Sequence, residues 1–190
     1  INCSHVVNEG GIGLKGVVFP KLTSHAISVG EKGNVWLKMI AKGNSGHGSV
    51  PRPDEAPIRL YQAVQKVLAM KQKTDFSPAL QLYMADLGRV KGGIQGFVLQ
   101  RPLLARWLVM PSLLKNPLTA AALSNTIHLT GFQGARKPNV VPSQAYAYLD
   151  CRLLPGVDPD DFVAELQDVV GPQIELEVLA AKAGNESTWN

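Results

Sequence analysis

The feature of this sequence that most limits its fold is the fixed order in which strand-like and helix-like hydrophobic patterns follow one another. In residues 35–42, apolar and polar or bulky residues alternate with a period of two, which is typical of a strand with one buried face. Prolines and acidic residues at 51–55 then open a helix. On this helix Ile58, Tyr61, Val64 and Leu68 share one face at helical spacing.

The second half of the chain repeats the strand and helix signals. Residues 127–132 and 145–152 both alternate, and Ala145, Ala147, Leu149 and Cys151 face one way in the second run. An acidic cluster at 158–161 opens a helix whose predicted buried residues are Phe162, Leu166 and Val169. Residues 174–178 form a last strand. This order predicts an α+β fold of the split β-α-β (ferredoxin-like) type, a four-stranded antiparallel sheet with two helices on one face.

Residues 74–125 interrupt that pattern as a helical insertion. The segment is rich in apolar residues, is broken by Pro102 and Pro111, and carries Arg101 and Arg106. We expect one to three short helices, one of them beginning at 116–117 with an asparagine cap and a proline. A membrane-surface role is disfavoured because the polar face lacks dense Lys and Arg. No apolar run approaches the roughly 18–20 residues that span a bilayer, so we expect a soluble chain with no membrane partner.

Composition and charge exclude several other classes. The net charge of +4 over 190 residues is too small to indicate nucleic acid by itself. Tyr146 and Tyr148 lie two apart on one predicted sheet face and could stack on bases. However, no strand carries the basic, glycine-rich aromatic run of RNA-binding sheets, and Glu175 and Glu177 add negative charge, so no nucleic-acid partner is expected. Two cysteines make neither a disulfide framework nor a zinc quartet.

His47 is the first candidate for chemistry. It lies between Gly46 and Gly48 in a loop that joins the first strand to the first helix. Glycines let such a loop approach a ligand closely, and an exposed histidine can donate a hydrogen bond or a proton. The plainer alternative is a loop histidine that caps the helix or faces water.

Asn139 and Arg152 flank the strand at 145–152. An asparagine side chain at the strand entrance can donate a hydrogen bond to a carbonyl oxygen that gains negative charge. An arginine guanidinium binds a carboxylate through two parallel hydrogen bonds, which suits recognition of an amino-acid carboxylate. The alternatives are a turn asparagine and a salt bridge from Arg152 to Asp150 or to another surface acid.

Glu9 is a weaker candidate, for a metal ligand. A co-catalytic zinc pair needs several histidine and carboxylate ligands. The sequence contains no H-x-D, no adjacent Glu-Glu and no H-E-x-x-H. We therefore expect that this chain cannot complete a metal site by itself.

Five motifs, taken together and in order, resemble the zinc-dependent aminoacylase and carboxypeptidase family. They are NEGG at 8–11, SVGEKG at 28–33, SGHGS at 45–49, PNVVP at 138–142 and DCRLLPG at 150–156. That family includes carboxypeptidase S, aminoacylase, acetylornithine deacetylase and succinyl-diaminopimelate desuccinylase. The insertion looks most like that of the carboxypeptidase S branch. One departure is Gly48, where relatives usually have serine or alanine.

The resemblance implies a domain organisation. Residues 1–26 would be a fragment of a two-zinc catalytic domain, residues 27–179 the lid or dimerisation domain with its insertion at 74–125, and residues 180–190 a linker back to the catalytic domain. We therefore interpret the chain as a piece of a longer protein that forms homodimers through the lid.

The resemblance also implies roles for the candidate residues. Glu9 would ligate one zinc ion, and His47 would cross the dimer interface to stabilise the carbonyl oxygen in the partner's active site. Asn139 would make a second polar contact, and Arg152 would bind the substrate carboxylate. The parent enzyme would hydrolyse the amide bond of N-acyl amino acids or small peptides, whereas the isolated chain would be inactive. The alternative is a non-catalytic dimerisation or protein-interaction module.

Overall fold

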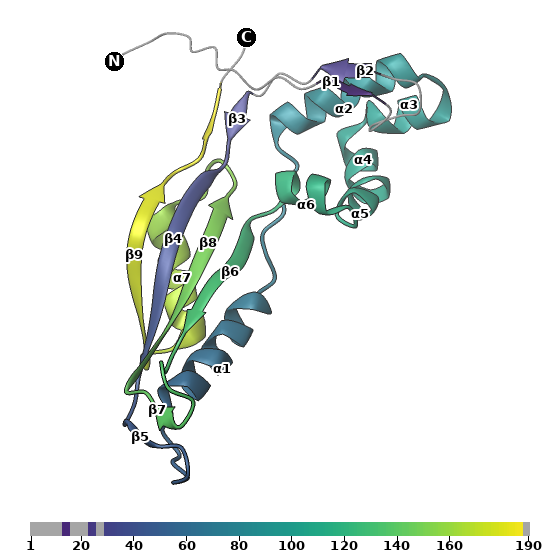
Figure 1. Ribbon diagram of the computed structural model, residues 1–190. Coiled ribbons are helices and arrows are strands. Elements are labelled where there is room, and N and C mark those ends of the chain that lie inside the picture. Colours follow the sequence, from purple (N-terminus) through teal and green to yellow (C-terminus); the bar gives the residue numbers. More distant parts are fainter. Residues whose placement is uncertain (1–12, 16–22, 26–28, 188–190) are drawn as a thin grey trace.

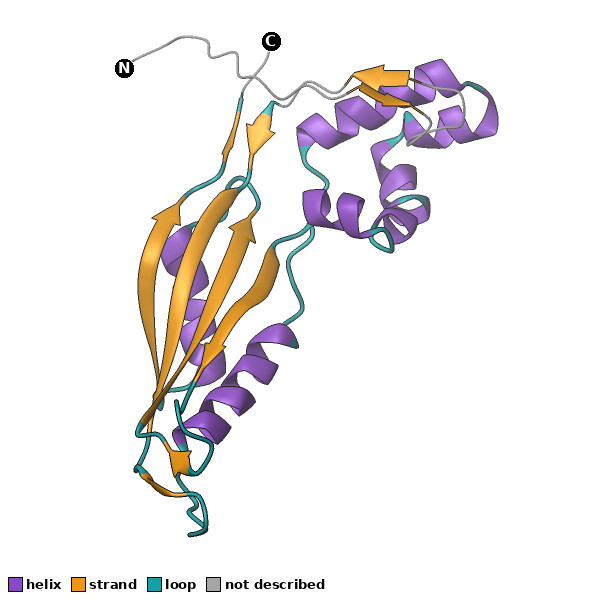
Figure 2. Ribbon diagram, viewed as in Figure 1, coloured by secondary structure: helices purple, strands orange, loops and turns teal. Residues whose placement is uncertain are grey.

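The computed structural model describes residues 13–15, 23–25 and 29–187. Its centre is a four-stranded antiparallel sheet with the strand order β6-β8-β4-β9 (Figure 1). The strands are β4 (Gly33–Lys42), β6 (Thr126–Gln133), β8 (Gln144–Leu153) and β9 (Ile174–Lys182). Helices α1 (Ala56–Leu68) and α7 (Pro159–Val170) cover one face of this sheet (Figure 2). The predicted α+β fold is confirmed.

The main core lies between the sheet and these two helices. Ala145, Ala147, Leu149 and Cys151 of β8 point into it, as their alternation predicted, and all four are buried. In α7, Asp158 caps the first turn by accepting hydrogen bonds from the backbone N–H groups of residues 160 and 161. The cap fixes the first turn of α7, and the buried residues of this helix, Phe162, Leu166 and Val170, face the sheet.

Helix α1 buries a different face from the one that its most prominent apolar residues suggested. The buried residues are Ala56, Leu60, Ala63, Val64 and Val67. Ile58, Tyr61 and Leu68 are each about half exposed. Small alanines allow α1 to lie close to the sheet, so the larger side chains remain on the outside. Helix α1 is therefore apolar on two faces, and only one of them is covered.

The insertion forms a separate helical block, which we define as residues 76–123. It contains α2 (Pro78–Lys91), α3 (Gly93–Leu99), α4 (Pro102–Leu108), α5 (Met110–Leu113) and α6 (Pro117–Leu123). These are more helices than the one to three expected. The reason is that prolines begin new helices here rather than forming loops, since a proline at the first or second position loses no helical hydrogen bond.

The helical block has its own core. Six side chains are buried there together: Phe76, Met84, Leu87, Leu99, Ala105 and Met110. Helices α2 and α3 cross at Gly88 and Gly96, where a Cβ on either glycine would lie within 2.7 Å of the other's carbonyl oxygen. The block is joined to the sheet by Lys32, whose Nζ donates to the carbonyl oxygens of Ala121 (2.9 Å) and Ser124 (2.7 Å).

The two ends of the sheet differ. At the end where β4 begins, the short strands β3 (Gly30–Glu31) and β10 (Asn185–Glu186) pair with each other. At the opposite end, β5 (Gly46–His47) pairs with β7 (Val140–Val141). We call these the β3–β10 end and the β5–β7 end (Figure 1). Strand β9 continues to Lys182, past the expected last strand residue at 178, because a bulge opposite Trp36 and Leu37 keeps it paired with β4.

Strands β1 (Gly13–Lys15) and β2 (Thr23–His25) form a separate antiparallel pair. Glu9 lies outside the described residues, as does most of the predicted catalytic-domain fragment at 1–26. The metal-ligand role of Glu9 therefore stays a prediction.

Candidate functional site

The β5–β7 end brings the backbones of His47 and Asn139 together. His47 lies directly opposite Val140, and the N–H of Gly48 donates to the carbonyl oxygen of Asn139 at 2.9 Å. The two-stranded ribbon formed by β5 and β7 is fixed to the sheet by a 2.9 Å hydrogen bond from the N–H of Gly43 to the carbonyl oxygen of Ser143. Two segments that are about ninety residues apart in the sequence thus form a single exposed tip.

The hydrogen bonds of His47 define which ring nitrogen can act on a ligand. Its Nδ1 lies 2.8 Å from Oγ of Ser49, and the backbone N–H of Ser49 also donates to Nδ1 at 3.3 Å. Since a backbone N–H can only donate, this geometry suits the tautomer in which Nδ1 accepts and Nε2 carries the proton. The exposed imidazole can then donate from Nε2 to an external oxygen.

Ser49 is a functional candidate that the sequence reasoning did not single out. It orients the imidazole of His47 through both its hydroxyl group and its backbone N–H. The sequence signals for this role are its place at the end of the SGHGS motif and its position two residues after the histidine, a spacing that suits a side chain–backbone turn.

Asn139 is exposed at the same tip, on the rung of the ribbon next to that of His47. Side chains on neighbouring rungs of a strand pair alternate between faces. The pairing therefore places both residues at one end of the molecule but does not by itself aim both side chains at one point.

The glycines of this loop are not equivalent, which yields a stability prediction. A Cβ on Gly43 would lie 2.4 Å from the carbonyl oxygen of Asp54, whereas a Cβ on Gly48 would lie no closer than 3.4 Å to any neighbour. We expect Gly43→Ala to destabilise the fold by about 1–3 kcal/mol because backbone must move. We expect Gly48→Ala to raise stability by about 0.4–1 kcal/mol through a less flexible unfolded chain. Urea unfolding of both variants tests this, and equal effects would contradict the described loop geometry.

Arg152 lies at the other end of the sheet, on the face that no helix covers. Its guanidinium meets the Asp150 carboxylate through two contacts, Nε to Oδ1 at 2.8 Å and Nη2 to Oδ2 at 2.9 Å, of which the second has hydrogen-bond geometry. The hydrogen bond to Asp150 raises the pKa of Arg152. The salt bridge that the sequence left as an alternative is therefore formed, and it holds the guanidinium by one edge, with Nη1 outside the contact.

At this β3–β10 end Lys32 lies near Arg152, and the acidic residues Glu31, Asp150 and Glu186 lie at the same end. Burial is the main cause that lowers the pKa of Lys32, and the nearby charge of Arg152 lowers it further. The two cations are therefore close enough to affect each other's ionisation, with the Asp150 carboxylate as the counter-charge of Arg152.

The distance between the two ends excludes a site formed by all three residues of one chain. Gln144, beside the β5–β7 end, and Arg152 are eight positions apart on β8, or about 26 Å at the usual rise per residue. A small substrate cannot span that distance. His47 and Asn139 can share a pocket with an Arg152 only if that arginine belongs to another subunit.

The described residues do not offer a zinc site. In the ranges 13–15, 23–25 and 29–187, no cluster of three or more His, Cys, Asp or Glu side chains could hold a metal ion. A zinc ion with three or more protein ligands would therefore need at least some of them from polypeptide outside these ranges.

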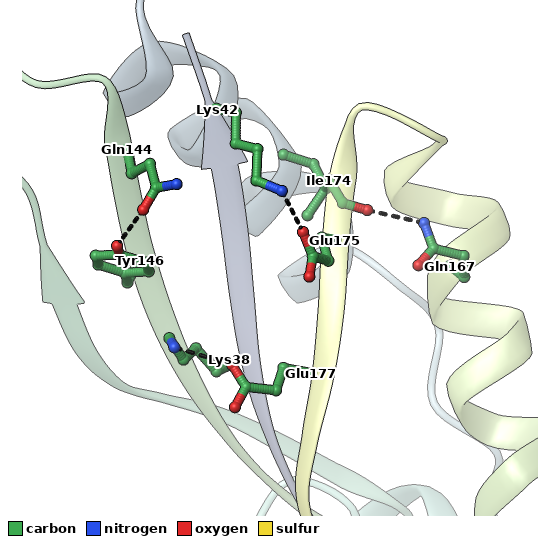
Figure 3. Close-up of polar contacts among 8 residues, drawn as sticks. All are labelled: Lys38, Lys42, Gln144, Tyr146, Gln167, Ile174, Glu175 and Glu177. Atoms are coloured by element: carbon green, nitrogen blue, oxygen red, sulfur yellow. Dashed lines mark hydrogen bonds and ion pairs between the residues drawn. The ribbon is translucent and has the colours of Figure 1, made fainter. Parts of the chain in front are cut away.

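The open face of the sheet carries two lysine–glutamate ion pairs near Tyr146 (Figure 3). Lys38 pairs with Glu177 at 2.9 Å and Lys42 with Glu175 at 2.7 Å, both from β4 to β9. The Lys38 ammonium also lies 5.0 Å from the centre of the Tyr146 ring. These lysines already have partners, so this face offers little positive charge to a phosphate backbone.

Comparison with known proteins identifies the family. Residues 29–175 match the family model described as a peptidase dimerisation domain, M20_dimer. A probable carboxypeptidase S-like 2 of Dictyostelium discoideum is 30% identical over 87% of this chain and 32% of its own length. The human N-fatty-acyl-amino acid synthase/hydrolase PM20D1 is 27% identical over 95% of this chain and 37% of its own length. The chain thus spans about a third of the length of these curated relatives.

Solved structures agree at the level of the fold. The di-peptidase Dug1p of Saccharomyces cerevisiae superposes with a TM-score of 0.57 at 15% identity, over 85% of this chain and 38% of its own. The family model, the curated relatives and this fold together show that the chain belongs to the peptidase dimerisation domain family of the M20 peptidases.

Proposed function

We propose that this domain forms a homodimer and completes, across the twofold axis, the active site of a two-zinc hydrolase that cleaves the amide bond of N-acyl amino acids or small peptides. The observation that carries the proposal is the placement of His47 and Arg152 at opposite ends of one antiparallel sheet. Two such domains, arranged head to tail, would bring unlike ends together. The printed names of the relatives, an N-fatty-acyl-amino acid hydrolase and a carboxypeptidase-like protein, support the amide substrate class.

The β6 edge of the sheet is the dimer surface that we propose. Leu129 and Phe132 of β6 lie opposite buried residues of β8, on the helix-covered side of the sheet, yet they are 40% and 45% exposed. Beside them, α1 exposes its second apolar face, which holds Ile58, Tyr61 and Leu68. An open edge strand next to an exposed apolar helix face is a surface suited to pairing with a second copy.

The β9 edge is less suitable. It exposes Val178 and Leu179, but its glutamates are engaged with the lysines of β4. The neighbouring helix α7 adds a row of exposed acids, Asp160, Asp161, Glu165 and Asp168. A second copy docked here would place like charges against one another, which is unfavourable.

Antiparallel pairing of β6 with its twofold copy would produce the shared site. Strand β6 runs from Thr126, which pairs with Arg152, to Gln133 near the β5–β7 end. In a symmetric antiparallel pair the end of one strand meets the start of the other. The tip with His47 and Asn139 would then approach the Arg152 end of the partner subunit.

The chemistry of each group fits a site in which one subunit contributes His47 and Asn139 and the other contributes Arg152. The proton on Nε2 of His47 would donate to the substrate carbonyl oxygen as negative charge develops on it, with Asn139 as a second polar contact. Arg152, held at one edge by Asp150, would bind the substrate carboxylate through its remaining N–H groups. The zinc ions would polarise the carbonyl group and supply the attacking water. They would be held by residues beyond those that the structure describes, and Glu9 is one candidate ligand.

The dimer surface is tested by charge substitutions on the two sheet edges. We expect the wild-type chain to sediment as a dimer and Phe132→Asp to sediment as a monomer, because a buried unpaired carboxylate costs several kcal/mol. Val178→Asp, at a similarly exposed position on β9, is the matched control and should remain dimeric. Thermal unfolding of each variant checks that the fold is intact. A monomeric wild type, or dissociation by Val178→Asp alone, would contradict the proposed surface.

A further inference from the structure

The helical block exposes apolar side chains more completely than any other described part of the chain. The five most exposed large hydrophobic residues all lie in it: Ile94 (85%), Trp107 (79%), Leu103, Val90 and Leu108. Elsewhere in the described residues, no large apolar side chain is exposed beyond the 53% of Tyr61. Soluble surfaces carry isolated apolar residues, but a concentration of this kind marks a contact surface.

The exposed residues follow the outward faces of α3 and α4. In α3, Gly96 and Leu99 are buried, and Ile94 and Phe97 lie on the opposite side at a spacing of three. In α4, Ala105 is buried, and two i, i+4 pairs face outward: Leu103 with Trp107, and Leu104 with Leu108. Both helices therefore place their apolar stripe away from the block's own core.

The same block carries the whole net charge of the chain. Residues 76–123 contain five of the 19 Lys and Arg residues, but only one of the 15 Asp and Glu residues, namely Asp86. The remainder of the chain is electrically balanced. The five cations are spread along the block: Arg89 and Lys91 lie in α2, Arg101 precedes α4, Arg106 lies in α4, and Lys115 follows α5; Arg89 also pairs with Asp86. The guanidinium of Arg101 stacks over the Phe97 ring, 3.4 Å from its centre, so charge and apolar surface adjoin directly.

From this combination we propose that the helical block is a peripheral membrane-contact surface that lies on anionic lipid bilayers. Exposed Trp, Leu and Ile side chains would enter the boundary between headgroups and acyl chains, and the Arg and Lys side chains would pair with anionic headgroups. No helix within the described ranges combines the length and hydropathy needed to cross a bilayer, so the contact would be superficial. The sequence disfavoured a membrane-surface role because Lys and Arg residues are sparse in the insertion. The structure adds that the apolar faces of α3 and α4 are uncovered and that Arg101 adjoins them.

Vesicle flotation of the 190-residue chain tests the proposal. The probes are vesicles of phosphatidylcholine alone and of phosphatidylcholine mixed with phosphatidylserine. We expect binding to the mixed vesicles that weakens as salt is added, because surface charge is screened. Arg101→Gln with Arg106→Gln should weaken binding roughly 30-fold, at about fivefold for each cation. Ile94→Ser with Trp107→Ser should weaken it on the order of a hundredfold, from the lost apolar burial.

Matched controls separate this surface from the remainder of the molecule. Lys66→Gln with Lys71→Gln removes two exposed cations outside the block, and Val178→Ser removes an exposed apolar residue on β9. Both should bind vesicles like the wild type. Three results would overturn the proposal: no binding to mixed vesicles, equal binding to phosphatidylcholine alone, or a fall in oligomer mass caused by Ile94→Ser with Trp107→Ser. The last result would show that the block contacts a second copy of the chain. The dimer proposed above is tested by sedimentation without lipid, so either proposal can fail alone.

Discussion

Replacing His47 by alanine is expected to lower turnover about 100- to 1,000-fold in a dimeric enzyme that contains this domain, with its metal content unchanged. The reason is that an oriented N–H donor to a developing oxyanion acts mainly in the transition state, and the Ser49 contacts leave Nε2 of His47 free for that role. The measurement is kcat on an N-acyl amino acid, with zinc quantified in the same preparation. Ser49→Ala should produce a smaller loss, because it leaves the imidazole but loosens its orientation.

A mixed dimer shows whether the donor acts across the interface. One subunit carries His47→Ala and the other Arg152→Gln, and each variant alone forms an inactive homodimer. If His47 serves its partner's site and Arg152 serves its own, the mixed dimer contains one site with both native groups. About half of the wild-type activity per dimer should then return.

Two outcomes would contradict the proposed division of roles. A mixed dimer that stays inactive would mean that both residues serve the same subunit's site, which the separation of about 26 Å along β8 makes difficult. Normal turnover of the His47→Ala enzyme would instead favour the alternative that the domain serves only dimerisation.

The second large effect concerns Cys151, which should react with thiol reagents about a thousandfold more slowly than an ordinary cysteine at pH 8. Burial, and to a lesser degree the charge of Asp150, raises the pKa of its thiol from 9.0 to about 12. The reactive thiolate is therefore scarce, and the side chain is fully enclosed in the core. The measurement is the rate of modification in a Cys3→Ser variant, in which Cys151 is the remaining cysteine.

The same variant in concentrated urea is the control, since unfolding should restore the ordinary rate. Rapid modification at pH 8 under native conditions would show that the sheet opens readily around β8, contrary to the described core.

The sequence was a reliable guide wherever a single local pattern decided the outcome. The alternation in β4 and β8 and the acidic start of α7 reproduce the order and direction of the central sheet, because side-chain period and capping are local properties. The loop motif around His47 likewise predicted an exposed histidine. The salt bridge between Arg152 and Asp150 followed from two residues that share one strand face.

The same local reasoning failed where two surfaces competed for one element. The prominent apolar residues of α1 stay half exposed because smaller ones fit closer to the sheet, which no periodicity reveals. Ser49 escaped notice because its role depends on a turn that brings its hydroxyl group back to Nδ1 of His47.

The sequence alone thus determined the order of the four central strands and of the two helices that cover them, the fold class, and the chemical identity of the candidate residues, since each depends on residue type and local spacing. Only the tertiary structure decided that His47 shares one tip with Asn139 and so lies at the end of the sheet opposite Arg152. It also decided which apolar faces are left uncovered on α1, β6 and the helical block. The physical reason is that strand pairing and packing join residues far apart in the chain, and no local pattern encodes the partner that each face will meet.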